Sequence, residues 1–195
     1  MEKLYFNLDL TLTEMNRTFD ECFEDTLEEL NIRDEKIDAG RYSEIFFEIF
    51  GSMEPNPREK TFRKYFEEKN IDSEPEKASG IYKNKELEAV EPVEELKRTL
   101  EELSEDFRLG IVTAGTTELQ KKKLEKLGIT EIFEDVLITY EEGKSKRRIL
   151  NELGDNSIYF SNSDSDIEKA EEAGVKSVNS DFTSAGKIRS EVGKL

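Results

Sequence analysis

The chain has 195 residues, a formal net charge of −17 and no histidine; 35% of its residues are hydrophobic and 38% are charged. This length suits one domain with a modest insertion, and the composition is too apolar for a disordered chain. Without an imidazole, histidine metal ligands and Ser-His-Asp triads are excluded, so any catalysis must use carboxylates, lysines, hydroxyls or backbone groups.

The negative charge also limits the partners that we expect. A surface this acidic repels phosphate backbones and anionic membranes, which predicts neither nucleic acid nor a membrane as a partner. No apolar run approaches the roughly 18 residues of a membrane span, and no signal peptide is evident. The single Cys22 cannot form an internal disulfide, so we expect a cytoplasmic protein. The acidity fits either a well-solvated surface or adaptation to high internal salt, and the oligomeric state and any protein partner stay open.

Five short apolar runs predict strands, and segments with helical spacing separate the later ones. Strand and helix in alternation predict an α/β fold with a Rossmann-like parallel sheet covered by helices. The predicted strands are residues 3–8, 107–113, 135–139, 157–161 and 175–179.

The alternation is interrupted between the first and second strands. Apolar residues there recur at helical intervals, and Pro55, Pro57 and Pro75 divide the region. We therefore expect an all-helical cap at residues 16–88, inserted into a core of residues 1–15 and 89–195. The aromatic residues between Tyr42 and Phe50 are interpreted as part of the cap's own core.

Polar side chains follow the predicted strands at their carboxyl ends, where open parallel sheets bind ligands. The first strand ends in NLDLT, the second in VTAG and the fourth in SNSDSD, and EEGKSK precedes the helix after the third. Together these segments predict one site with the residues Asn7, Asp9, Thr113, Lys144 or Lys146, Asn162 and Asp166.

The order of these elements resembles the haloacid dehalogenase superfamily of phosphohydrolases, in the branch with a helical cap that includes phosphoglycolate phosphatase-like enzymes. The family's first motif is Asp-x-Asp-x-Thr, and NLDLT matches it at Asp9 and Thr11 but carries Asn7 at the first position. The second motif, a Ser or Thr that closes the second strand, is matched by Thr113.

The third motif of the family is a lysine, for which Lys144 is our first choice and Lys146 the alternate. The fourth is Gly-Asp-x-x-x-Asp, and here Ser161 replaces the glycine, Asn162 replaces the first aspartate and Asp166 is in place. Asp164 is interpreted as a helix cap, although it is also a candidate replacement for the missing carboxylate. The run Lys121–Lys123 is interpreted as a solvated helix face.

The resemblance implies a role for each position. Residue 7 would attack phosphorus, Asp9 would act as general acid and base, and the lysine would balance charge. The implied phosphate-binding groups are Thr113, the amides of Ala114 and Gly115, and Lys144. The implied Mg²⁺ ligands are Asn7, the Asp9 carbonyl, Asn162 and Asp166.

Two of these positions carry an amide where the family carries a carboxylate. An amide is a poor nucleophile, and loss of a nucleophile costs on the order of 10⁶ in rate in a triad-like unit. We expect a phosphohydrolase homologue that is catalytically impaired, has a weak or lost Mg²⁺ site and binds a phosphorylated small molecule or acts as a pseudoenzyme.

Two alternatives stay open. The first alternative is an active Mg²⁺-dependent phosphatase or an inactivated variant of one. The second is a structural or interaction domain with a vestigial cleft. The sequence does not name the substrate, and it does not say whether Asn7 and Asn162 are natural or engineered.

Overall fold

The structure is a computed structural model that describes residues 2–33, 37–154 and 156–194. The chain forms two compact units, one made of Met1–Glu14 with Glu91–Leu195 and the other of Met15–Val90. The core and cap boundaries expected from the sequence differ from this division by one or two residues.

The first unit is built on a parallel sheet whose described strands lie in the order β5-β4-β1-β6-β7. The first strand of the chain lies at the centre, where Phe6 is paired with Ile111 on one side and with Phe160 on the other. The prediction of an α/β fold with a parallel sheet is confirmed. The strands are β1 Lys3–Phe6, β4 Arg108–Thr113, β5 Asp135–Ile138, β6 Ser157–Ser161 and β7 Lys176–Asn179.

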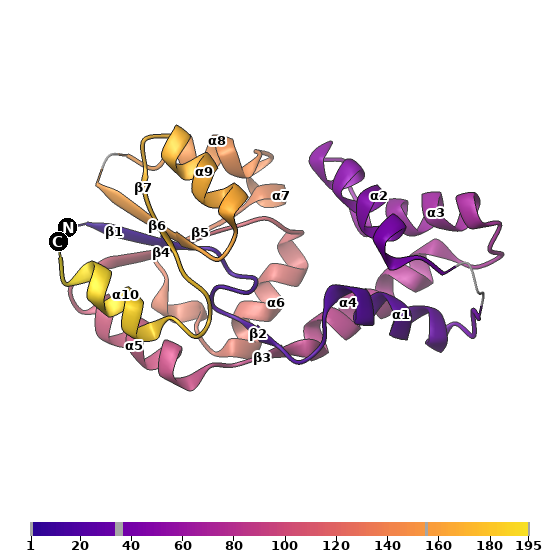
Figure 1. The fold of residues 1–195 in the computed structure, drawn as a ribbon, viewed down its shortest axis with the longest axis horizontal. Coiled ribbons are helices and arrows are strands. Elements are labelled where there is room, and N and C mark those ends of the chain that lie inside the picture. Colours follow the sequence, from indigo (N-terminus) through magenta and orange to yellow (C-terminus); the bar gives the residue numbers. More distant parts are fainter. Residues whose placement is uncertain (1, 34–36, 155, 195) are drawn as a thin grey trace. The chain divides into compact units, whose positions relative to one another are not determined.

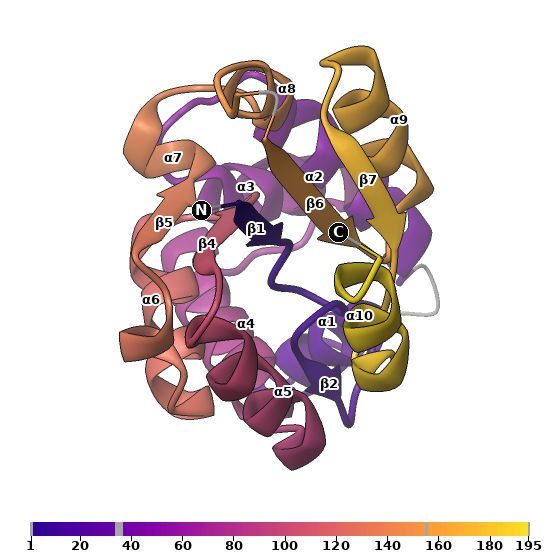
Figure 2. The same cartoon turned by 90° about the vertical axis from the view of Figure 1, so that its left-hand side faces the viewer.

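Helices cover both faces of this sheet, with α8 and α9 on one face and α5, α6 and α10 on the other (Figures 1 and 2). Tyr5, Val112 and Tyr159 pack under α8 and α9 in one apolar cluster. Phe6 lies on the opposite face, where its ring stacks on Phe160 at a centroid distance of 4.8 Å. The helices are α5 Glu94–Ser104, α6 Thr117–Leu127, η1 Thr130–Ile132, α7 Thr139–Glu142, α8 Lys146–Asn151, α9 Asp164–Glu172 and α10 Ala185–Val192.

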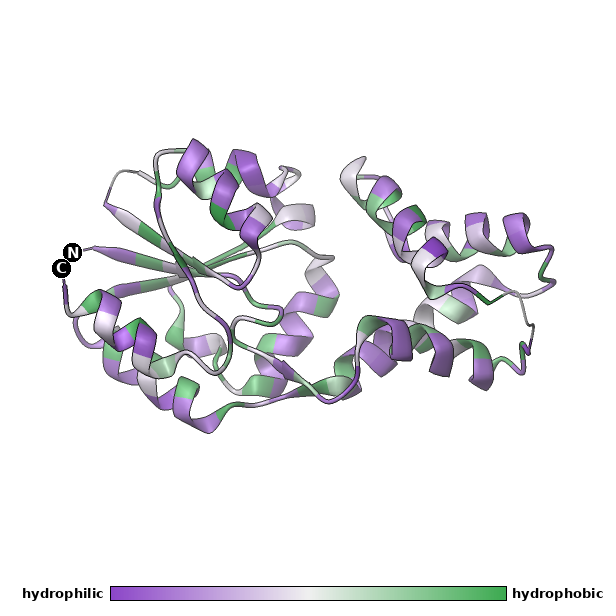
Figure 3. Cartoon of the chain, viewed as in Figure 1, coloured by the Kyte–Doolittle hydropathy of each residue, from purple (hydrophilic) through white to green (hydrophobic). Residues whose placement is uncertain are grey.

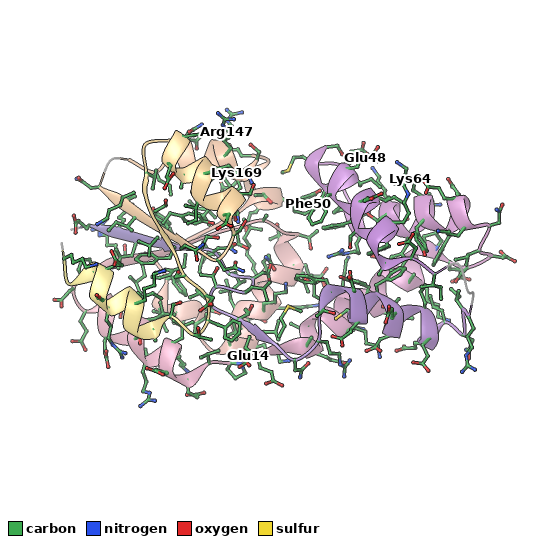
Figure 4. The ribbon with its side chains drawn as sticks, viewed as in Figure 1. Glu14, Glu48, Phe50, Lys64, Arg147 and Lys169 are labelled. Carbon is green, nitrogen blue, oxygen red and sulfur yellow. The ribbon has the colours of Figure 1, made fainter. Side chains whose placement is uncertain are left out.

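The second unit is helical, as the periodicity predicts. Thr18 and Glu21 form a capping box at the start of α1, and prolines occupy the first turns of α3 and α4. Its core contains Cys22 and an aromatic cluster that includes Tyr42, while Glu48 of α2 pairs with Lys64 of α3 at 2.8 Å (Figure 4). The helices are α1 Phe19–Glu29, α2 Ala39–Gly51, α3 Pro57–Lys69 and α4 Pro75–Ala89.

The two segments that connect the units pair with each other. Glu14–Met15 forms β2 and Val90–Glu91 forms β3, and these two strands make a separate small sheet. The backbone N–H of Asn16 extends this pairing by donating to the carbonyl of Ala89 at 3.0 Å.

Hydropathy follows the layers of the fold. The central strands are largely hydrophobic and the helices alternate between hydrophobic and hydrophilic faces (Figure 3). Across the described ranges, no helix is both long and apolar enough to cross a membrane.

Candidate functional site

The site begins at the carboxyl end of β1. Asn7 is 7% exposed, and its backbone N–H donates to the Phe160 carbonyl of β6 at 2.8 Å. Its side-chain nitrogen then donates to the carbonyl of Asp9 at 2.9 Å, which turns the chain. This turn ends β1 at Phe6, two residues before the end that the apolar run predicts.

The loop after Asn7 is fixed by two threonines. Leu10 has a φ of 58°, a costly value for a leucine, and its N–H donates to the Thr13 hydroxyl at 2.9 Å. Thr11 is fully buried; its hydroxyl donates to Asn162 Oδ1 at 3.2 Å and accepts from the Asn162 N–H at 3.1 Å. Thr11 therefore joins the loop after β1 to the loop after β6.

The second strand end is held by Gln120 of α6. Its amide nitrogen donates to the buried Thr113 hydroxyl at 2.8 Å and to the Ala114 carbonyl at 3.1 Å. A Cβ on Gly115 would lie 2.6 Å from the Gln120 side chain, so any larger residue here would force Gln120 to move. The Gly115 N–H, one of the predicted phosphate-binding amides, donates to Thr139 Oγ1 at 3.2 Å.

Both oxygens of the Asp9 carboxylate contact α6. Lys123, which is fully buried, donates to Oδ1 at 2.6 Å, and Gln120 donates to Oδ2 at 2.9 Å. Burial raises the pKa of Asp9, but the charge and hydrogen bond of Lys123, with the bond from Gln120, outweigh it and leave the pKa below its ordinary value. Asp9 is therefore held as a carboxylate.

The lysine in this site is Lys146, at the first position of α8. Its ammonium donates to Asn7 Oδ1 at 3.0 Å and to Asp166 Oδ2 at 2.5 Å. Burial lowers the pKa of Lys146, whereas Tyr159 and Asp166 raise it, and the net shift is upward. The pKa of Asp166 is raised by burial but lowered further by Lys146 and Lys169, so this pair is ionised.

The preference for Lys144 is corrected by this geometry. Lys144 follows the left-handed Gly143, and its ammonium lies 2.5 Å from Glu152 Oε2 on the same surface segment. Two residues later, Lys146 begins a helix that directs its side chain to the sheet. The structure brings the other predicted site residues together, and Lys146 is the lysine that lies among them. These residues are Asn7, Asp9, Thr113, Asn162 and Asp166.

Three residues of the site were missed or misread from the sequence. Gln120 gave no signal, and Lys123 was read as part of a solvated run; its neighbours Lys121 and Lys122 do pair with surface carboxylates. Lys169 of α9, labelled in Figure 4, donates to Asp166 Oδ1 at 3.2 Å.

Asp164 does not replace a missing carboxylate. Its Oδ1 accepts from the Asn179 side chain at 2.9 Å, and the residue is exposed. The N-cap of α9 is Ser163, and Asp164 is the first residue of the helix. Within the three described ranges, no three His, Cys, Asp or Glu side chains gather in a group that could hold a metal ion.

A parallel sheet in the order β5-β4-β1-β6-β7, with polar groups at the carboxyl ends of β1, β4 and β6, defines an α/β protein with an open parallel sheet and a helical insertion after its first strand. The sequence profile of the haloacid dehalogenase-like hydrolases matches residues 4–180. The chain belongs to this family, and the resemblance drawn from its motifs is confirmed at that level. A search of curated protein sequences returned no match.

Solved structures with this fold include several members of the family. The HAD-hydrolase YfnB from Bacillus subtilis was solved bound to magnesium and is 17% identical to this chain. The alignment covers 90% of this chain and 86% of YfnB, with a TM-score of 0.72. The haloacid dehalogenase-like protein SP0104 from Streptococcus pneumoniae is 22% identical over 91% and 83%, with a TM-score of 0.61. L-2-haloacid dehalogenase from Xanthobacter autotrophicus is 12% identical over 91% and 76%, with a TM-score of 0.66.

Proposed function

We propose that this haloacid dehalogenase-like hydrolase is catalytically impaired and that its core binds a phosphorylated small molecule. The observation that carries the proposal is the state of Asn7. Its oxygen accepts from Lys146 and its nitrogen donates to the Asp9 carbonyl, so the position that carries the attacking carboxylate in the family presents a neutral, hydrogen-bonded amide.

The second part of the proposal concerns Mg²⁺, which the family implies. A hard divalent cation selects anionic oxygens, yet residues 7 and 162 offer neutral amides. The amide nitrogen of Asn7 lies 2.9 Å from the Asp9 carbonyl, the backbone oxygen that would be a ligand. These donors do not fit the ion well, so we propose that Mg²⁺ binds weakly and assign it no step.

The retained phosphate-binding groups support ligand binding. Thr113 closes β4, and its hydroxyl accepts from Gln120 while still carrying a hydrogen to donate. Lys146 supplies a buried positive charge, and its ammonium donates to Asn7 Oδ1 at 3.0 Å. An ester phosphate bound here would meet no carboxylate able to attack it from position 7.

A turnover assay tests the impairment. The chain is assayed with p-nitrophenyl phosphate and Mg²⁺, and chloride release from 2-chloropropionic acid is measured in parallel because a dehalogenase shares the fold. We expect background rates for both substrates. Robust Mg²⁺-dependent turnover by the unmodified chain would contradict the proposal and favour an active phosphatase.

A matched pair of variants makes the assay sharper. Asn7→Asp combined with Asn162→Asp restores both carboxylates, whereas Asn84→Asp with Asn151→Asp adds the same charge at two exposed helix positions. We expect activity to rise only in the first pair. Phosphate binding without turnover separates this proposal from a vestigial interaction domain, which would bind nothing at this site.

A further inference from the structure

Lysines outnumber carboxylates among the ion-paired side chains of the site. Three lysines and two aspartates form ion pairs at the site: Lys123 pairs with Asp9, and both Lys146 and Lys169 pair with Asp166. These side chains leave a local charge of +1 in a protein whose net charge is −17. Carboxylates at positions 7 and 162 would reverse the local charge to −1.

We propose that this site binds a phosphate group directly through its lysines, without a divalent cation, and that Lys169 is its outer cation. The inference rests on the proposed function and deepens it. It names the charge that replaces Mg²⁺ and adds a binding residue that the sequence did not reveal.

Hydrogen-bond donors occupy the oxygens that a metal ion would need. The Asn7 amide nitrogen donates to the Asp9 carbonyl, and the Thr11 hydroxyl donates to Asn162 Oδ1. The Lys146 ammonium donates to Asp166 Oδ2. The orientation of the Asn7 amide is set by its neighbours, because the reverse would point its nitrogen at an ammonium and its oxygen at a carbonyl. A divalent cation would have to displace these donors, whereas an anion would not.

Lys169 is the accessible member of the charge cluster. Its side chain is 38% exposed, while Lys146 is 8% exposed and Lys123 is 1% exposed. Asp166 receives Lys146 on one oxygen and Lys169 on the other, so the carboxylate holds two ammonium groups beside the loop of Asn162. An ammonium has three donors, so Lys169 keeps donors for a phosphate oxygen while it is bound to Asp166.

Titration calorimetry with inorganic phosphate tests the proposal on the full chain, once with EDTA and once with Mg²⁺. We expect the same dissociation constant in both conditions. Lys169→Met should weaken phosphate binding by about tenfold, the loss of one charged hydrogen bond of about 1.4 kcal/mol. Lys169→Arg should retain binding. Lys122→Met, which removes an exposed lysine paired with Glu118, is the control and should change nothing.

The outcomes separate the two proposals. Phosphate binding that requires Mg²⁺, or an unchanged affinity in Lys169→Met, would overturn this inference while leaving the impaired turnover standing. No phosphate binding in either condition would overturn both the inference and the ligand part of the proposed function. The Asn7→Asp, Asn162→Asp variant should lose phosphate binding in EDTA, and a variant that kept it would contradict the charge argument. Circular dichroism of each variant confirms that it is folded.

Discussion

Lys144 and Lys146 are two positions apart in the sequence, but their surroundings in the structure are different. One lies at the surface beside Glu152, and the other is buried between Asn7 and Asp166. Sequence patterns place a lysine in this segment, but only the end of α7 at Gly143 and the start of α8 at Lys146 decide which side chain turns inward. The choice between these two lysines depends on a helix boundary, which sequence periodicity locates only to within a few residues.

The charge state of Asp166 should make stability pH-dependent. Lysines lower its pKa in the folded chain below the unfolded value of about 4. The stabilisation is therefore present above that unfolded value and is lost as the pH falls through the folded pKa. Urea unfolding of the wild type and of Asp166→Asn should differ most near neutral pH, and the difference should shrink in acid. A difference that stays constant down to the acid limit would show that the ion pair contributes nothing to it.

At the scale of single elements, the Tyr5 ring of β1 occupies the space beside Gly110 of β4 that a side chain would fill. A Cβ on Gly110 would lie 2.4 Å from the Tyr5 ring and 3.3 Å from the Asp135 carbonyl. The Tyr5 hydroxyl is also fixed, because it donates to Asp135 at 3.0 Å. The ring cannot move aside without losing this bond and its place among the buried side chains under α8 and α9.

Gly110→Ala should therefore destabilise the first unit by about 1 to 3 kcal/mol, the usual cost of overpacking. Gly186→Ala, at an exposed position of α10 where a Cβ meets nothing within 4 Å, is the control. It should be neutral or stabilising by up to about 1 kcal/mol, because alanine is the better helix former. Both variants are compared by urea denaturation. Equal stabilities for the two variants would show that Tyr5 can relax.

At the scale of the whole molecule, the chain has one cysteine, and it lies in the core of the second unit. Cys22 is fully buried, and burial raises the pKa of its thiol to about 11. The thiolate is the reactive form, so the native protein should react slowly with iodoacetamide. Alkylation should accelerate only when the second unit opens.

Pulse alkylation across a urea series, read by mass spectrometry, measures this opening. A variant with Cys22→Ser and Ser52→Cys moves the thiol to an exposed position on the same unit and should be labelled at once. Since the chain has two compact units, the labelling midpoint need not coincide with the midpoint measured by circular dichroism. If native Cys22 reacted as fast as the exposed control, the packed core described around it would be wrong.

The sequence predicted the parallel sheet and the helical insertion because alternation and helical periodicity are local signals. It also predicted which strand ends carry the polar groups, since Asn7, Thr113 and Asn162 each follow an apolar run. It missed Gln120 and misread Lys123, because a helix that carries lysines on three successive positions gives no sign of which one faces inward. That distinction arises from the packing of α6 against the loop of Asp9.

The pairing of β2 with β3 has a consequence for how such a chain can change over time. The helical segment leaves and rejoins the remainder of the polypeptide at adjacent points, like a large loop closed at its base. Loop-closure entropy grows only slowly with loop length. A closed segment of this kind can be lengthened, shortened or exchanged with little thermodynamic effect on the sheet, so the binding residues and the inserted helices are free to evolve at different rates.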